Sequence, residues 1–188
     1  NPQFQNVEEA LKYPFVPVEE TSIGKHTLKM IEYFLDKTRG NLPLSFTDSQ
    51  SPLNIATELI PVDNFLMDLY MNPDAVMKFL DRIADLIVEF YKKQEKLIGE
   101  CLVKPGHGFA SSRHFNGNGF SDDMIHMLSP DLYESYVRPS LVKAGNPFGG
   151  PVFHSCGNWT KFIDVVKTIP GLLTVDGAFS EETDPEPN

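Results

Sequence analysis

The sequence predicts an α/β protein built on a parallel sheet. Short apolar runs alternate along the chain with longer segments whose apolar residues recur at helical spacing, which is the pattern of βαβ units. We expect four strands, whereas a complete (β/α)8 barrel of the TIM type has eight strands and about 250 residues. The chain has 188 residues. We therefore expect a single domain over residues 1–188 that holds about half of such a barrel.

The chain is expected to begin with coil and one helix. Residues 1–20 contain three prolines, which prevent a long helix, so an extended coil is predicted there. Apolar residues at helical spacing predict a helix over residues 22–39, and Gly40 is a suitable stop. The apolar run 42–46 predicts a short strand, which leads into the polar turn 47–52.

Two further helices complete the expected first half. The first covers residues 53–70 and is interrupted at Pro61. The second is the clearest in the chain, because Asn72 is a good N-cap, Pro73 fits the first helical position and Gly99 ends the apolar stripe.

The second half is predicted to add three strands and two helices. The expected elements are a strand in 106–114, a turn at 116–119, a helix over 129–144 interrupted by Pro139, a strand at 151–156, a helix of about ten residues after Asn158, a strand at 172–176 and an acidic coil at 180–188.

Composition excludes several classes of partner. The net charge of −10 and the pI of about 4.9 argue against binding to nucleic acid or to an anionic membrane surface. No apolar stretch approaches the roughly 20 residues that span a bilayer, and no signal peptide is recognised. Two cysteines 55 positions apart do not form a disulfide framework, so a reducing cytoplasm is expected. The start at Asn1, without a methionine, suggests a partial chain.

The most informative segment is the predicted strand 151–156. Residues i and i+2 of a strand point to the same face, so His154 and Cys156 are expected to lie side by side at its C-terminal end. One nitrogen and one sulfur donor suit Zn²⁺. The ordinary alternatives are a neutral core histidine and a packing thiol.

Other polar residues are expected near the same edge, because the carboxyl ends of parallel strands carry the working groups of such folds. Asp48 follows the first predicted strand, Arg113 and His114 follow the second, and Asp176 ends the fourth. Asp48 is as suited to capping the following turn as to touching a substrate. Arg113 either pairs with an acid or clamps a substrate carboxylate.

The remaining candidates are weaker. Asp122 and Asp123 form either a solvated loop pair or helix cap, or a site for a cationic or N–H-rich ligand. His107 and His114 could supply a second metal site, although glycine-flanked loop histidines are usually solvated. Cys101 has no partner at metal-ligand spacing and is expected to be a buried thiol. No GxGxxG, P-loop, HExxH or GxSxG motif is present.

Three segments carry a family resemblance. Phe153-His154-Ser155-Cys156-Gly157-Asn158 resembles the zinc-binding HxCG motif of the cobalamin-dependent methyltransferases in the uroporphyrinogen decarboxylase superfamily. Phe120-Ser121-Asp122-Asp123, followed by Leu128-Ser129-Pro130-Asp131-Leu132-Tyr133 and Pro139, is similar to a second segment of that superfamily, and residues 42–59 are similar to its early strand and turn.

The resemblance covers roughly residues 40–180 and implies a (β/α)8 barrel with its site at the C-terminal mouth. In the methyltransferase branch it implies His154 and Cys156 as zinc ligands and, as the third, a cysteine that would lie beyond Asn188. Zinc then activates a small thiol that accepts a methyl group from a corrinoid, which a partner protein can carry. With His154 and Cys156 alone, the ion keeps one formal positive charge, which would make the bound thiolate less nucleophilic.

Three functions follow as expectations. The first is a zinc-dependent methyltransferase acting between a corrinoid and a small thiol. The second is a metal-free decarboxylase of a porphyrinogen-like tetrapyrrole, with a roomy cleft lined by Arg113 and by Asp122 or Asp123. The third is a non-catalytic tetrapyrrole-binding fragment. Half of a barrel also exposes strand edges, so self-association is expected.

Overall fold

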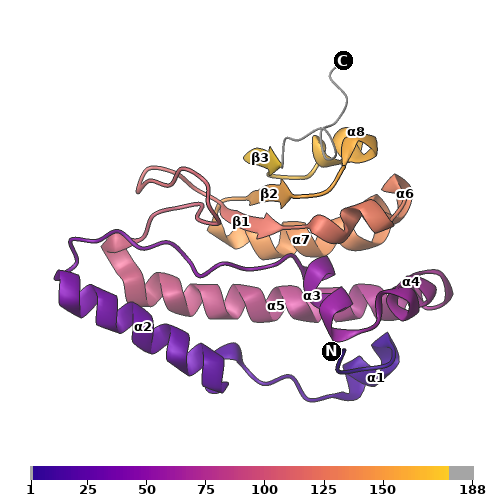
Figure 1. Ribbon diagram of the computed structural model, residues 1–188, viewed down its shortest axis with the longest axis horizontal. Helices are drawn as coiled ribbons and strands as arrows, with labels where there is room; N and C mark the ends of the chain where they lie inside the picture. The colour runs from indigo at the N-terminus through magenta and orange to yellow at the C-terminus, as the bar shows by residue number, and fades with distance from the viewer. Residues whose placement is uncertain (1, 178–188) are drawn as a thin grey trace.

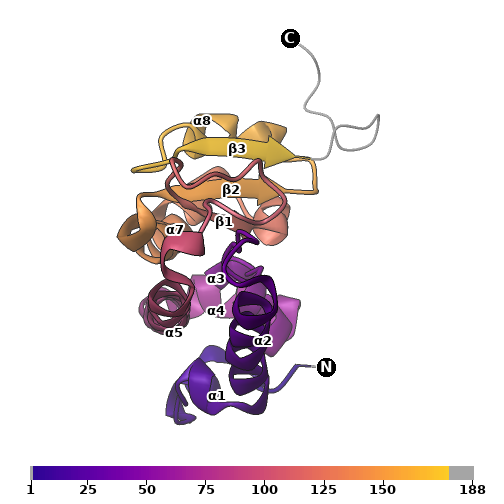
Figure 2. The same ribbon diagram turned by 90° about the vertical axis from the view of Figure 1, so that its left-hand side faces the viewer.

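The computed structural model describes residues 2–177 and shows a small parallel sheet beside a larger group of helices (Figure 1). The three strands lie at one end of the molecule, and the long helix α5 runs past them, with α7 between α5 and the sheet. Helices α1 and α2 pack against α5, with α2 beside it and α1 farthest from the sheet, as the turned view shows (Figure 2). The predicted α/β class, with about half of a barrel present, is confirmed.

The sheet has the order β1-β2-β3, and both neighbouring pairs are parallel. The strands are β1 (Asn118–Ser121), β2 (Pro151–Ser155) and β3 (Thr174–Gly177). The chain passes from β1 to β2 and from β2 to β3 through helical segments, so it forms two successive βαβ units. Ser121, His154 and Asp176 are cross-strand partners in this register, which gathers polar groups at one end of the sheet.

The helices of the first half carry about half of the buried core. They are α1 (Val7–Lys12), a 3₁₀ turn (Val18–Glu20), α2 (Ser22–Thr38), α3 (Pro52–Leu59), α4 (Val62–Met71), α5 (Pro73–Ile98) and a 3₁₀ turn (Gly99–Cys101). The predicted helices over 22–39, 53–70 and 72–99 are confirmed, including the break at Pro61. Every member of the apolar stripe predicted for α5 is buried, namely Val76, Phe79, Leu80, Ile83, Ile87, Phe90 and Tyr91.

The predicted coil over residues 1–20 is wrong, because α1 forms within it. Asn6 caps this helix by accepting the N–H of Glu9 at 2.9 Å, and Val7 and Ala10 are fully buried. The prolines limit the length of a helix here, but the window between them is wide enough for six residues.

Two strand predictions were also wrong. Residues 42–46 do not form a strand, and only Leu44 makes a single parallel bridge, to Leu102. The segment 106–114 is a loop, and the strand forms instead at Asn118–Ser121, where a turn was predicted. All four residues of β1 are buried beside β2. Pairing with a buried neighbour therefore overrides the local turn preference of the Asn-Gly pairs.

The helices of the second half are shorter and less regular. The segments are a 3₁₀ turn (Asp123–Met127), α6 (Pro130–Leu132), a π-helical stretch (Tyr133–Val137), α7 (Arg138–Gly145), 3₁₀ turns (Asn146–Phe148 and Thr160–Phe162) and α8 (Ile163–Val166). The predicted helix over 129–144 is therefore divided. The predicted acidic coil at 180–188 lies outside the described residues.

The sheet presents two different faces. Phe120 and Phe153 are fully buried among the helices, and Phe153 packs edge-on against Trp159. Because side chains alternate along a strand, the neighbours Ser121 and His154 point to the opposite face. No helix within residues 2–177 combines the length and apolar character needed to cross a bilayer.

Candidate metal centre

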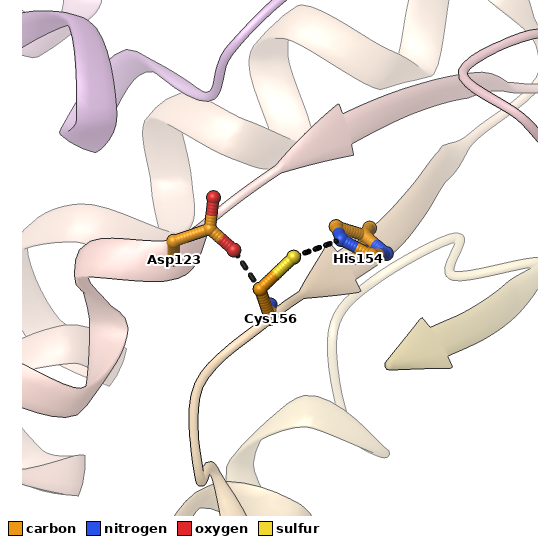
Figure 3. Close-up of side chains that lie close together, drawn as sticks. All are labelled: Asp123, His154 and Cys156. Atoms are coloured by element: carbon orange, nitrogen blue, oxygen red, sulfur yellow. Dashed lines mark hydrogen bonds between the residues drawn. The ribbon is translucent and has the colours of Figure 1, made fainter. Parts of the chain in front are cut away.

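His154 and Cys156 meet at the C-terminal end of β2. His154 is the fourth residue of the strand and Cys156 follows its last residue, and His154 Nε2 lies 2.9 Å from Cys156 Sγ (Figure 3). The strand ends at Ser155, one residue before Cys156, and the cysteine is exposed. The pair thus offers a nitrogen and a sulfur donor on one side of the sheet.

Asp123 joins this pair from the end of β1. Its Oδ1 accepts the backbone N–H of Cys156 at 2.6 Å, and its Oδ2 accepts the Ser121 hydroxyl at 2.6 Å. Donor atoms of Asp123, His154 and Cys156 all lie within 4.8 Å of one another. Figure 3 shows the three side chains converging at the ends of two neighbouring strands. The sequence predicted that Asp123 is either a solvated or capping residue or part of a site for a cationic or N–H-rich ligand, and it did not place this residue beside the two donors.

The electrostatics of the group favour a cation. Burial alone would raise the pKa of Asp123, but the hydrogen bonds from Cys156 and Ser121 and the nearby His154 outweigh it, so its pKa is lowered. The pKa of the Cys156 thiol is raised by burial and by the charges of Asp123 and Asp176. Without a cation, Cys156 therefore stays a thiol at neutral pH and is a poor nucleophile.

Asp122 lies next to the donor group and links the segments that surround it. The residue is 1% exposed, its carboxyl group accepts hydrogen bonds from the Ser51 and Tyr133 hydroxyls, and its backbone N–H donates to the carbonyl of His154 at 2.8 Å. Burial raises the pKa of Asp122 to about 6. The side chain is enclosed and binds Ser51 and Tyr133 rather than facing a ligand, while the backbone N–H joins the end of β1 to β2.

The other two predicted aspartates each contact a histidine. Asp176 Oδ2 lies 3.1 Å from Nδ1 of His154, as their pairing in the β2–β3 register requires. Asp48 binds Nδ1 of His107, whose ring is 5.2 Å from that of His154 between centroids. The side chain of His107 is only 13% exposed, so the expectation of a solvated loop histidine was wrong.

Arg113 and His114 are not part of this group. Both lie in the loop that precedes β1, because the strand predicted for 106–114 does not form. His114 lines a cavity of about 480 Å³ together with Val152 and Thr174 of the sheet. The cleft predicted between Arg113 and Asp122 or Asp123 is not this cavity, since none of the three lines it.

Sequence reasoning missed Asn54 and Ser121. Asn54 Nδ2 donates to Asp123 at 3.4 Å, and its Oδ1 accepts the N–H of Met124 at 3.0 Å. The available signal was the alternation along β1, which puts Ser121 on the face of His154, but the strand itself was not predicted.

The donor chemistry fits zinc. Imidazole nitrogen, thiolate sulfur and carboxylate oxygen are all common zinc ligands. Tetrahedral zinc with ordinary bond lengths holds a nitrogen and a sulfur about 3.5 Å apart. The 2.9 Å between His154 Nε2 and Cys156 Sγ would have to open by about half an ångström. This is a small change for an exposed cysteine.

Comparison with known proteins shows the family of the chain. Residues 2–103 match the family described as uroporphyrinogen decarboxylase (URO-D). The chain belongs to the uroporphyrinogen decarboxylase family. The match begins earlier than the expected residues 40–180 and ends before the donor cluster. None of the curated protein sequences compared with the chain matches it significantly.

This family member also resembles a solved structure, a methyltransferase from Methanosarcina mazei. The TM-score is 0.64 at 16% sequence identity, and the similarity covers 88% of this chain and 45% of that protein. At such low identity the likeness shows the fold alone. The chain spans less than half the length of that methyltransferase.

Proposed function

We propose that the chain is part of a zinc-dependent methyltransferase that moves a methyl group between a corrinoid and a small thiol. The observation that carries this proposal is the convergence of His154, Cys156 and Asp123 at the carboxyl ends of two parallel strands. Family membership and the fold of the methyltransferase neighbour agree with it.

Each residue of the group has a separate role in the proposed site. His154 and Cys156 donate to the metal, and Asp176 holds the His154 ring through Nδ1, which leaves Nε2 as the donor atom. Asp123 fixes the backbone of Cys156 and contributes a negative charge. When bound, zinc would keep the acceptor thiol ionised at neutral pH, which is the form that attacks a methyl group.

Asp123 also resolves a difficulty of charge. A divalent ion held by His154 and Cys156 alone keeps one formal positive charge, which holds a thiolate tightly and weakens it as a nucleophile. The ionised carboxylate of Asp123 lies beside both donors and offsets that charge. The site can therefore be formally neutral before the substrate thiol enters.

The proposal is tested by metal content and methyl transfer. We expect the purified chain to bind one zinc ion, and His154→Ala and Cys156→Ser each to lose it, as measured by elemental analysis after dialysis. His26→Ala, on α2, is the matched control and should keep the metal. Methylation of a small thiol from a methylated corrinoid should disappear with the zinc. Full zinc occupancy in either site variant would reject the ligand assignment.

The runner-up is a decarboxylase-like lyase acting on a tetrapyrrole, favoured by the family match over residues 2–103. It requires no metal. Decarboxylation of a porphyrinogen that persists in the presence of a strong chelator, and in Cys156→Ser, would favour this function over methyl transfer.

A further inference from the structure

We propose that a cavity with Asp48 in its wall binds a small protonated amine that has an apolar body. The cavity has a volume of about 360 Å³ and is lined mainly by residues of α3, α5 and the loop before α3. Ligand pockets have volumes of about 300–1,000 Å³, so this one suits a small molecule of about a dozen water-sized groups at about 30 Å³ each. The inference goes beyond the proposed function and depends on neither zinc nor a corrinoid.

Most of the cavity wall is apolar. Phe15 and Val18, which precede α2, line it together with Ile55 of α3 and Leu86 of α5. The wall also includes Phe90, which is buried. A ligand that brings apolar surface against this wall removes that surface from water, which favours binding.

One side of the cavity is polar, because the consecutive residues Thr47, Asp48 and Ser49 all line it. The side chain of Asp48 is 65% exposed, so it lies at the mouth. Tyr91, which also lines the cavity, is buried. A ligand would therefore place its apolar part inside and keep its polar group beside Asp48.

The hydroxyl groups on this polar side already donate hydrogen bonds within the chain. Tyr91 donates to the carbonyl of Thr47 at 2.6 Å, and the Thr47 hydroxyl donates to Oε1 of Gln94 at 3.3 Å. Ser49 donates to the carbonyl of Gln50 at 2.9 Å. These hydroxyls can still accept a hydrogen bond, but their protons are in use. A ligand bound here must therefore supply donors of its own.

Asp48 determines the charge that suits the site. Its Oδ1 binds Nδ1 of His107, and within residues 2–177 no hydrogen bond engages its Oδ2. Burial and the charge of Asp48 both raise the pKa of Tyr91, so the field of this carboxylate extends along the polar side. A protonated amine is positive and has three N–H donors and no acceptor, which matches this side. The Thr27 hydroxyl, also in the lining, can donate or accept.

The test is isothermal titration calorimetry of the metal-free chain with phenethylamine, which is protonated at neutral pH. The neutral 2-phenylethanol and the anion 3-phenylpropionate have similar shapes and serve as comparison probes. We expect the amine to bind about tenfold more tightly than the alcohol, because hydrogen bonds between charged groups are stronger than neutral ones. The anion should not bind at the same concentrations. In NMR spectra, the amine should shift the amide signals of Thr47 and Ser49.

Two variants separate the polar and apolar parts of the cavity. Asp48→Asn should remove the preference for the amine while the alcohol still binds. Leu86→Trp should abolish binding of both, because the larger side chain fills the cavity. Asp63→Asn and Leu66→Trp are the matched controls, since both residues lie on α4 and neither lines the cavity. They should bind all three probes as the unmodified chain does.

Equal affinities for the amine and the alcohol in the unmodified chain, or an unchanged preference in Asp48→Asn, would overturn the proposal. Binding that persists in Leu86→Trp, or NMR shifts confined to residues away from the cavity, would overturn it as well. If Leu86→Trp does not fold, Ile55→Phe fills the same cavity from α3 and replaces it in the test. None of these results depends on zinc, so a failure here leaves the proposed function to its own test.

Discussion

There is no room for a side chain at Gly119. A side chain there would enter the volume occupied by His107, with 2.5 Å between the two Cβ atoms, although the backbone of Gly119 does not lie in the left-handed region. We predict that Gly119→Ala displaces His107, whose ring contacts that of His154, and lowers zinc affinity about tenfold. Competition with a chelating indicator measures the effect.

The control for this prediction is Gly99→Ala. Gly99 has φ of +58° and nothing within 4 Å of a built Cβ, so alanine strains the backbone there without touching the site. It should lower stability and leave zinc affinity unchanged. Equal affinity in Gly119→Ala and the unmodified chain would show that the position of His107 does not matter to the metal.

We expect the free energy of unfolding of the metal-free chain to fall as the pH rises from about 4 to about 6, because Asp122 loses its proton in that range. Burial raises its pKa from 3.8 to about 6. Between these values the folded chain keeps a proton that the unfolded chain has lost, so the stabilising contribution is complete below pH 4 and is lost as the pH passes 6. The shift corresponds to about 3 kcal/mol in the free energy of unfolding.

The measurement is urea denaturation at several pH values for the unmodified chain and for Asp122→Asn. The difference between the two isolates Asp122 from other acids, including Asp123, whose lowered pKa acts in the opposite direction. We expect the unfolding free energy of the variant, relative to the unmodified chain, to rise by about 2–3 kcal/mol between pH 4 and pH 7. A constant difference across that range would contradict the assignment.

The start of α3 depends on one hydroxyl with two roles. Ser51 Oγ accepts the N–H of Asn54 at 3.1 Å as the N-cap, and it also donates to the buried carboxyl of Asp122. We predict that Ser51→Ala lowers the free energy of unfolding by about 2–4 kcal/mol, because a helix cap and a buried hydrogen bond to a carboxyl are lost together.

Thr21→Ala provides the comparison, measured by the same urea denaturation. Thr21 caps α2 by accepting the N–H of Gly24 at 3.0 Å, and its hydroxyl donates only to the backbone carbonyl of Val18. Its loss should cost about 1 kcal/mol. Equal costs for the two substitutions would mean that the bond from Ser51 to Asp122 contributes nothing measurable.

The division of the helix after β1 has a local cause and a distant consequence. Pro139 has no N–H to donate to the carbonyl of Ser135, so a regular α-helix cannot continue through this turn. The π-helical stretch Tyr133–Val137 lies at this point. Its first residue, Tyr133, donates to the buried carboxyl of Asp122, which links the irregular helix to the site.

The outer edge of β3 is an open surface of the described chain. Within residues 2–177 no strand pairs with that edge, and Val175 is 44% exposed beside Ile163 and Trp159. Unpaired edges with apolar neighbours promote association between chains. We predict that the chain self-associates at micromolar concentration and that Val175→Lys shifts it toward the monomer mass of 21.1 kDa, as measured by light scattering.

Tyr70→Lys is the matched control for association. Tyr70 is 69% exposed on α4, away from the sheet, and the substitution adds the same charge. It should leave the association unchanged. A monomeric unmodified chain, or equal effects of the two substitutions, would place the contact elsewhere or remove it.

Local pattern predicted much of the helical half and the two strands that carry His154 and Asp176. The stripe of α5 repeats over seven buried positions, and such a long periodic signal identifies a helix without knowledge of its neighbours. Likewise, the alternation in β2 is enough to place His154 beside Cys156, because the geometry of a strand is local.

Long-range pairing decided the rest. The residues of β1 have the composition of a turn, and they form a strand only because β2 lies beside them. That strand brings Asp123 to Cys156 and leaves room for His107, and no spacing in the sequence encodes either approach. The sequence by itself determined which donors share a strand, since that depends on neighbouring residues. Only the tertiary structure decided which other groups join them, because contacts across the sheet depend on register and packing between distant segments.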